Sequence, residues 1–129
     1  LQAMDWQTLV GRRAKKDAPD KGGWNLLMTG FNAHDVWTPI ANPAMDARGE
    51  KSGWFGWAKD DELVSLRDRF LRATDEADKK KLADAIQTRA YAVGTHVTLG
   101  DIDLPLAASK RVSGFFVTNG HLYWNLKKE

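Results

Sequence analysis

A chain of 129 residues has the length of one domain, and its net charge is only +2 because 17 acidic residues offset 19 basic ones. The two signs are interspersed, so the chain offers no single-sign field that would hold a nucleic acid or an anionic membrane surface. Cysteine is absent, which excludes disulfide bonds, thiolate metal sites and cysteine nucleophiles.

The first residues predict a strand followed by a helix. Leu1 to Met4 read as a short strand, and Asp5 has the carboxylate of a good helix N-cap. One face of the predicted helix carries Trp6, Leu9, Val10 and Arg13. Cationic residues continue to Lys16, and Pro19 with the pair Gly22-Gly23 should end the helix. Because the chain opens with Leu1 inside a strand pattern, we expect it to be a fragment of a longer protein.

The apolar run Trp24 to Met28 has almost no alternation, as in a strand that is covered on both faces. Strand, helix and strand in this order predict a right-handed parallel βαβ unit, because the connection is long enough for a crossover.

A long irregular segment from Trp24 to Trp57 contains four of the six tryptophans. Connections longer than about 12–15 residues without regular structure are uncommon in compact domains and are often functional. So many large apolar rings are not typical of disorder, so we expect an ordered, aromatic-lined loop. Its rings Trp54, Phe55 and Trp57 either stack on a planar ligand or pack the loop onto a helix that begins near Asp60.

Two helices are predicted after this loop, beginning at Asp60–Asp61 and at Thr74, the second with Gly94 at its C-terminal end. The apolar stripe of the first consists of Leu63, Leu66, Phe70 and Leu71. The stripe of the second consists of Leu82, Ala83, Ile86, Ala90 and Val93. The short joint predicts antiparallel neighbours.

From Thr95 onward the hydrophobic period becomes two, which predicts short strands. Alternating apolar residues are Val97, Leu99, Ile102, Leu104 and Leu106. Residues 112–117 and 121–126 are further strand candidates, and the turn signal Asn119-Gly120 between them predicts a hairpin.

Candidate chemical groups are few. The histidines His34, His96 and His121 lack the spacing of a metal site. His34 beside Asp35 is the one adjacent acid–base pair in the long loop, which leaves open a small hydrolase as well as a polar ligand contact. Asp101 and Asp103 lack the further oxygen ligands of a calcium loop. The sequence predicts no cofactor, no metal and no enzyme.

The order of several motifs resembles one protein family. The motifs are LQAMDWQTLVGRR, GWNLLMTGF, ANPAMDARG, GWFGWAKDDELVSLRDRFLRATDEADKKKLADAIQTRAYA, VTLGDIDLPLAASKRVSGF and LYWNLKK. Together they are similar to the C-terminal quarter of the extracytoplasmic solute-binding proteins of ABC transporters, in the peptide, oligopeptide and nickel class. The resemblance covers nearly the whole chain.

The resemblance implies an α/β fold, as a fragment of a two-lobed periplasmic-binding-protein fold of type II. Residues 1–31 would form part of the second lobe, residues 32–57 an interlobe crossing loop, and residues 58–129 the C-terminal part of the first lobe. Such a protein captures a peptide or other small solute between its lobes and delivers it to the permease subunits of an ABC transporter. The resemblance also implies a periplasmic or extracytoplasmic location, membrane association through the transporter, and a monomeric parent protein.

The predicted ligand-binding residues are Met28, Thr29, Gly30, Phe31, Asn32, His34, Asp35 and Trp37. By resemblance, Phe31 occupies the position at which peptide-binding relatives carry an aspartate for the ammonium group of the ligand. A neutral ring cannot make that charge-assisted hydrogen bond, so an amine would need Asp35 four residues later.

A third alternative is an interaction fragment that packs its exposed aromatic loop on another chain. Apolar surface that the rest of the protein would cover could also make the isolated fragment self-associate. An export signal in the parent protein would favour the solute-binding interpretation. A monomer at high concentration would argue against the interaction fragment.

Overall fold

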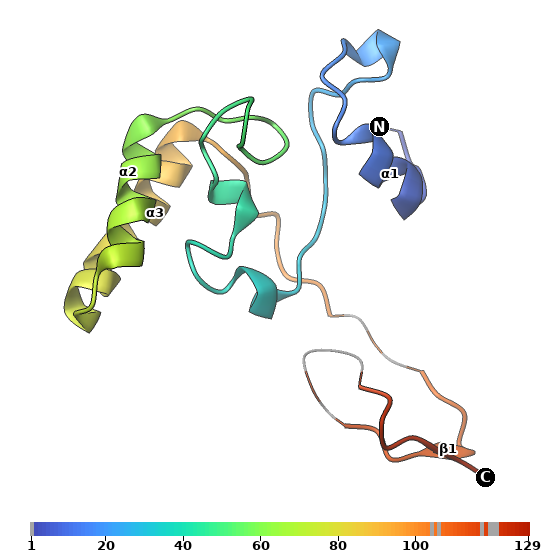
Figure 1. Cartoon of the computed structure of the whole chain (residues 1–129). Coiled ribbons are helices and arrows are strands. Elements are labelled where there is room, and N and C mark those ends of the chain that lie inside the picture. The colour runs from blue at the N-terminus through green and yellow to red at the C-terminus, as the bar shows by residue number, and fades with distance from the viewer. Residues whose placement is uncertain (1, 104, 106, 117, 119–121) are drawn as a thin grey trace. The chain divides into compact units, whose positions relative to one another are not determined.

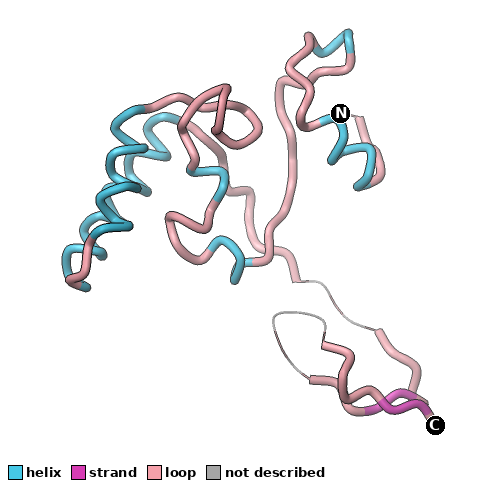
Figure 2. Tube along the Cα trace, viewed as in Figure 1, coloured by secondary structure: helices cyan, strands magenta, loops and turns pink. Residues whose placement is uncertain are grey.

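The structure, a computed structural model, describes residues 2–103, 105, 107–116, 118 and 122–129 (Figure 1). The chain divides into two compact units, Leu1–Val97 and Thr98–Glu129. Helices form the regular structure of the first unit and a two-stranded sheet that of the second, so the predicted mixture of helices and strands is confirmed. Loops occupy most of the chain between the first two α-helices (Figure 2). None of the described helices has both the length and the apolar character needed to cross a membrane.

The first helix, α1 (Trp6–Arg12), begins as predicted. The Asp5 carboxylate accepts a hydrogen bond from the backbone N–H of Thr8 at 3.0 Å and another from the Thr8 hydroxyl at 2.6 Å, which satisfies a free donor of the first turn. The helix ends at Arg12 and does not continue to Lys16 as expected. It buries no residue completely, so little tertiary packing is available to extend it.

A tight turn follows α1 and contains the 3-10 helix η1 (Pro19–Lys21). The guanidinium of Arg12 donates hydrogen bonds to the carbonyl oxygens of Gly22 at 3.1 Å and Gly23 at 2.7 Å. The Gly23 N–H donates to the carbonyl oxygen of Ala18 at 3.0 Å. Arg12 therefore folds the glycine pair back against the end of the helix.

The predicted βαβ unit is wrong for the described residues. Residues 2–4 and 24–28 form no strand, and Leu26 is exposed where two covered faces were expected; Leu1 lies outside the described residues. A strand needs a neighbour that supplies its ladder hydrogen bonds. Neither segment has such a neighbour among the described residues.

The helix pair α2 (Asp61–Arg72) and α3 (Glu76–Val93) packs side by side and antiparallel, as predicted (Figure 1). Its core of fully buried side chains consists of Ala47, Leu63, Ile86 and Ala90. Leu66 and Phe70 are partly buried against this core, in agreement with the predicted stripe of α2. Leu71 was wrongly placed in that stripe, because its side chain is 63% exposed.

Side-chain caps fix the ends of the helix pair. The Asp60 carboxylate accepts from the Leu63 N–H at 2.7 Å at the start of α2. At the start of α3 the cap is Asp75, which accepts from the Asp78 N–H at 3.0 Å, so the prediction of Thr74 was one residue early. Gly94 ends α3 with a left-handed φ of 72°, as predicted, because glycine adopts that conformation without steric cost.

Asp60 also joins the two helices. Arg89 of α3 donates two hydrogen bonds to the Asp60 carboxylate, at 3.0 Å from Nε and 2.6 Å from Nη2, and pairs with Glu62 at 2.9 Å. The Arg89 hydrogen bonds, together with the N–H of Leu63, lower the pKa of Asp60 below its ordinary value.

This arrangement predicts an acid-sensitive helix pair. Because the folded pKa of Asp60 lies below the unfolded value of about 3.9, its stabilisation is complete above that value and is lost as the pH falls through the folded pKa. We expect Asp60→Asn to be less stable at neutral pH and to lose less stability than the wild type on acidification below about pH 4. Urea unfolding at a series of pH values, followed by helical circular dichroism, measures the difference.

The exposed neighbour of Asp60 supplies the matched control. Asp61→Asn removes one carboxylate from the same helix end but leaves the Arg89 hydrogen bonds in place. Parallel acid profiles for Asp60→Asn and the wild type would contradict the assigned role of Asp60.

A closed loop, residues 48–59, precedes the helix pair. Arg48 and Lys59 form an antiparallel bridge at its base, and the Gly49 N–H donates to the Ala58 carbonyl at 2.9 Å. Near the C-terminal end of the loop, where the SGWFGW motif ends, Gly56 and Trp57 both have positive φ, 98° and 51°. These two residues turn the chain back toward the base of the loop. The predicted long segment is therefore ordered by its own hydrogen bonds.

The second unit contains β1 (Val112–Ser113) and β2 (Lys127–Lys128), which pair antiparallel with Val112 opposite Lys128. Residues 97–103 and 105 form no strand, so the strands predicted there are wrong; they also lack a partner among the described residues. The second hairpin strand lies later than the predicted 121–126. The predicted positions Leu104, Leu106, Val117, Asn119, Gly120 and His121 lie outside the described residues.

Candidate functional site

The predicted ligand-binding residues lie in one continuous stretch, here termed the ligand segment (residues 28–37). It begins as extended chain and continues into the 3-10 helix η2 (Ala33–Val36). All eight predicted residues are exposed, with Met28 50%, Phe31 41% and Trp37 76% accessible. The segment therefore presents a mixed apolar and polar strip on the surface of the described part of the chain.

Local hydrogen bonds shape the polar part of the segment. The side-chain amide of Asn32 donates to Asp35 Oδ2 at 2.9 Å, and the Asp35 N–H donates to the Asn32 carbonyl, also at 2.9 Å. The His34 ring packs edge-on against Trp37, with ring centroids 5.7 Å apart. His34 and Asp35 thus have different partners, and the structure does not bring them together as an acid–base dyad.

Phe31 ties the ligand segment to the closed loop. Its ring lies 5.9 Å from that of Trp54, and Trp54 packs edge-on against Phe55 at 4.8 Å, measured between centroids. These loop aromatics pack against other parts of the chain, but their ring and cation contacts are not with the following helix as predicted. They contact Phe31 and the N-terminal part of the chain, where the sequence had suggested the following helix.

Two cationic side chains that follow α1 lie over aromatic rings of the closed loop. The guanidinium carbon of Arg13 is 4.6 Å from the Phe55 centroid and 5.4 Å from the Trp54 centroid, and Lys16 Nζ is 4.9 Å from that of Trp57. We call this group the cation–aromatic cluster; its members are Arg13, Lys16, Trp24, Trp54, Phe55 and Trp57. Cation–π contacts of this kind contribute about 0.5–1 kcal/mol when exposed and more when desolvated.

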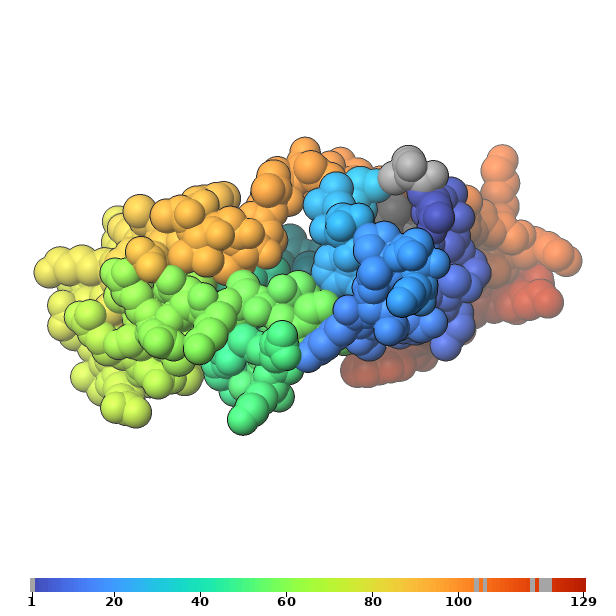
Figure 3. Space-filling view, turned by 90° about the horizontal axis from the view of Figure 1, so that it is seen from above, coloured from blue at the N-terminus to red at the C-terminus, as the bar shows by residue number. Residues whose placement is uncertain are grey.

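Trp24 completes the cluster from the other side of the turn. Its indole N–H donates to the Arg13 carbonyl oxygen at 3.1 Å, and its ring lies 6.0 Å from that of Trp57. The space-filling view shows the N-terminal turn meeting the segment that precedes α2 (Figure 3). The cluster therefore docks α1 and its turn onto the closed loop.

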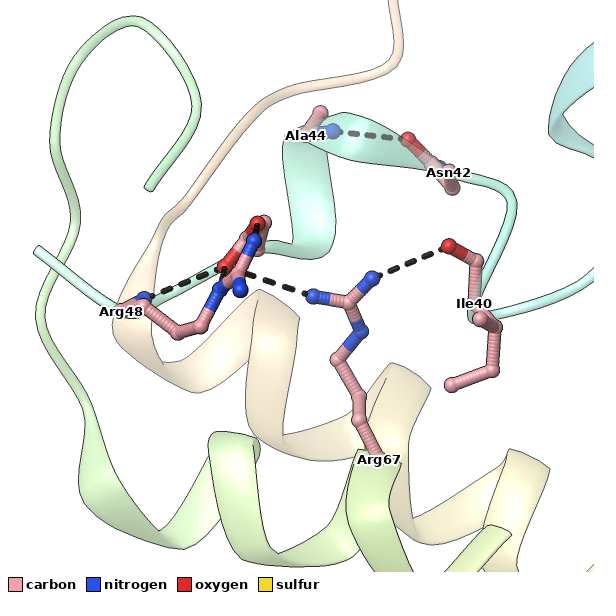
Figure 4. Close-up of polar contacts among 6 residues, drawn as sticks. Ile40, Asn42, Ala44, Arg48 and Arg67 are labelled. Carbon is pink, nitrogen blue, oxygen red and sulfur yellow. Dashed lines mark hydrogen bonds and ion pairs between the residues drawn. The ribbon is translucent and has the colours of Figure 1, made fainter. Parts of the chain in front are cut away.

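A polar frame holds the segment between the ligand segment and the closed loop. Arg67 of α2 donates to the Ile40 carbonyl at 3.0 Å and lies 3.6 Å from the Asp46 carboxylate (Figure 4). Arg48 donates to the same carboxylate at 2.8 Å, and this hydrogen bond lowers the pKa of Asp46 below its ordinary value. Arg67 thus fixes the path of the chain after Trp37 relative to the helix pair.

Sequence reasoning missed the role of Arg67, although a signal was present. Arg67 follows Leu63 by four residues and precedes Phe70 by three, so it lies on the buried side of α2. A cation in that position needs an acceptor from outside its helix. Arg13 had a similar signal, because the predicted apolar face of α1 already included it.

Other candidate groups contribute no site. Burial lowers the pKa of His96, whose ring stacks on Tyr91 with centroids 6.4 Å apart. Asp101 and Asp103 are exposed. Across the described residues, no three metal-binding side chains of the His, Cys, Asp or Glu type come together.

Comparison with known proteins finds a relative that matches nearly the whole chain. No protein-family model matches the chain. The chain is 33% identical over 128 residues to a probable peptide ABC transporter periplasmic-binding protein of Sinorhizobium fredii. This match covers 99% of the chain, which spans 24% of the length of that relative. The chain is therefore similar, over nearly its whole length, to one part of a probable periplasmic-binding protein of a peptide ABC transporter, and the resemblance predicted from its sequence is confirmed.

Proposed function

We propose that the chain is part of a longer periplasmic protein that binds a peptide or related small solute and delivers it to the permease subunits of an ABC transporter. The observation that carries the proposal is the similarity to the Sinorhizobium fredii periplasmic-binding protein, which extends over 99% of the chain. The association with the membrane would be indirect, through the transporter.

The predicted division of the chain belongs to the same proposal. Residues 1–31 would contribute to the second lobe, residues 32–57 would cross between the lobes, and residues 58–129 would complete the first lobe. The irregular path of the chain between α1 and α2 supports such a crossing (Figure 2). Segments 2–4 and 24–28 lack strand partners among the described residues, which agrees with pairing partners supplied by the remainder of the parent protein.

The ligand segment would form one wall of the binding cleft. Its exposed side chains Met28, Phe31 and Trp37 offer apolar contacts to a solute. Asp35 accepts a hydrogen bond from Asn32 at Oδ2, which leaves other acceptor positions of its carboxylate for a ligand ammonium group. The wall would therefore offer a solute apolar contacts together with one carboxylate.

Binding by the complete gene product tests the proposed function. Native mass spectrometry of the purified protein should detect a retained small solute, and calorimetry with defined short peptides should give saturable binding without turnover. Absence of an export signal in the complete gene product, or failure of both binding measurements, would contradict the proposal.

Trp37 allows a sharper test of the ligand segment. We expect Trp37→Ala to weaken solute binding by about tenfold or more, because an exposed aromatic side chain in a binding wall contributes large apolar contact area. The free energy of unfolding should change little, since the ring is 76% exposed.

Trp6 is the matched control, because it is another exposed tryptophan and lies on α1 outside the ligand segment. Trp6→Ala should leave affinity within about twofold of the wild type. Equal losses of affinity in the two variants would argue against a ligand-binding role for residues 28–37.

The structure favours binding over hydrolysis, because His34 and Asp35 engage different partners.

We also propose that the isolated chain self-associates through exposed apolar side chains such as Leu26 and Trp37. Light scattering over a concentration series measures this directly, and a monomer at every concentration would contradict it.

A further inference from the structure

We propose that Arg13 is a positioning residue for the ligand segment, acting through Trp54 on Phe31. This inference rests on the proposed function for its consequence in binding. Its structural part concerns the contacts of Arg13 and can be tested without a ligand.

The environment of Arg13 is unusual for an arginine. Its Nε is buried and has no hydrogen-bond partner among the described residues. Its guanidinium lies over the rings of Phe55 at 4.6 Å and Trp54 at 5.4 Å. A buried donor without an acceptor is uncommon and requires compensation, and here aromatic faces replace the missing acceptor.

The contact continues from Arg13 to the ligand segment. Trp54, beneath the guanidinium, lies 5.9 Å from Phe31, whereas the other ring contact of the segment, between His34 and Trp37, is internal. Among the ring contacts of the described residues, Phe31–Trp54 is thus the one that joins the segment to the closed loop. Because Arg13 holds one side of Trp54, it limits the positions that Phe31 can adopt.

Lys16 provides a comparison within the same cluster. It also places a cation over an aromatic ring, but that ring is Trp57, whose ring contact among the described residues is with Trp24 and not with the ligand segment. Loss of Arg13 removes its contacts with Trp54 and Phe55, and loss of Lys16 removes its contacts with Trp57 and Glu50. Only the loss of Arg13 should be transmitted to Phe31.

Hydrogen exchange in the ligand-free complete gene product tests the structural part. We expect Arg13→Gln to accelerate exchange of the backbone amides of residues 31–36 by about threefold or more relative to the wild type, including the Asp35 amide that bonds to Asn32. Lys16→Gln should leave these amides unchanged. Equal effects of the two variants, or no effect of Arg13→Gln, would overturn the proposal.

Ligand affinity tests the consequence, with the tripeptide alanyl-phenylalanyl-alanine as the probe. We expect Arg13→Gln to weaken its binding by about tenfold and Lys16→Gln to change it by less than twofold. If the wild type does not bind the tripeptide or any other short peptide, the proposed function fails while the exchange result still decides the role of Arg13. If the wild type binds and both variants bind equally well, the positioning role is excluded.

Two further variants separate positioning from general destabilisation. Trp54→Leu should reproduce the Arg13→Gln effect, and the double variant should lose little more than either single variant, because both interrupt the same chain of contacts. Additive losses would overturn the proposal. If Arg13→Gln does not fold, Arg13→Lys retains the cation but not the flat stacking surface; it should show a smaller exchange effect in the same amides, and wild-type exchange in Arg13→Lys would contradict the role.

Discussion

We expect Leu63→Ala to lower the free energy of unfolding of the helix pair by about 2–5 kcal/mol. The Leu63 side chain of α2 is completely buried in the core that it forms with Ala47 and with residues of α3. Its truncation therefore removes apolar contacts and leaves a cavity. Ile86 lies on the facing helix and is also fully buried, which limits how far the core can collapse. Urea unfolding followed by far-ultraviolet circular dichroism measures the change.

Leu71 is the control, because it belongs to the same helix and is 63% exposed. Leu71→Ala should change the free energy of unfolding by no more than about 0.5 kcal/mol. The pair of variants thus compares identical chemical changes in two environments. Similar midpoints for both would mean that Leu63 is not part of a cooperative core.

Gly23→Ala should destabilise the N-terminal part of the chain by about 1–3 kcal/mol. Gly23 is buried in the turn after α1, and a Cβ atom there would overlap the carbonyl oxygen of Asp17 and lie 3.2 Å from that of Ala18. The turn must open to accommodate it, which weakens the hydrogen bonds from Arg12 to the glycine carbonyls. Tryptophan fluorescence during urea unfolding reports the change through Trp24, the next residue.

The same substitution at Gly11 should have the opposite effect on stability. It lies inside α1, and a Cβ placed on it would meet no atom within 4 Å apart from its chain neighbours and the backbone of its own helix. Gly11→Ala should therefore stabilise α1 by about 0.5–1 kcal/mol, because alanine restricts the unfolded chain more than glycine does. Stabilisation by Gly23→Ala would show that the turn adopts a different conformation.

The helix pair could be predicted from sequence because its determinants are local. The spacing of Leu63, Leu66 and Phe70 fixes the buried face of α2. Gly94 adopts the left-handed conformation that ends α3 more readily than other residues do. The cap of α3 was misplaced by one residue, because Thr74 and Asp75 are adjacent residues that both accept amide hydrogen bonds well.

The predicted strands failed for a different reason. Apolar character at residues 24–28 favours an extended chain, but a strand exists only when a second segment supplies hydrogen bonds. The described part of the chain contains no such segment for these residues. Strand propensity was therefore uninformative about pairing.

The site was partly accessible from sequence. Family resemblance selected the ligand segment, whose predicted residues are exposed in the structure. The contacts of Arg13 with Trp54 and Phe55 join positions about forty residues apart, and neither residue's neighbours in sequence indicate the other. Such distant pairs depend on how the closed loop folds, and local sequence patterns do not indicate that fold.

The hydrogen bonds at the base of the closed loop determine where residues can be inserted in this region or deleted from it. The Gly49–Ala58 and Ala47–Asp60 hydrogen bonds bring the two ends of the loop together, at 2.9 Å and 3.0 Å. Extra residues inserted between them would add only loop-closure entropy, about 0.6 kcal/mol for each doubling of loop length. The start of α2 would keep its register because it is fixed outside the insertion point. Homologous chains can therefore gain or lose residues around positions 50–52 while the helix pair keeps its packing.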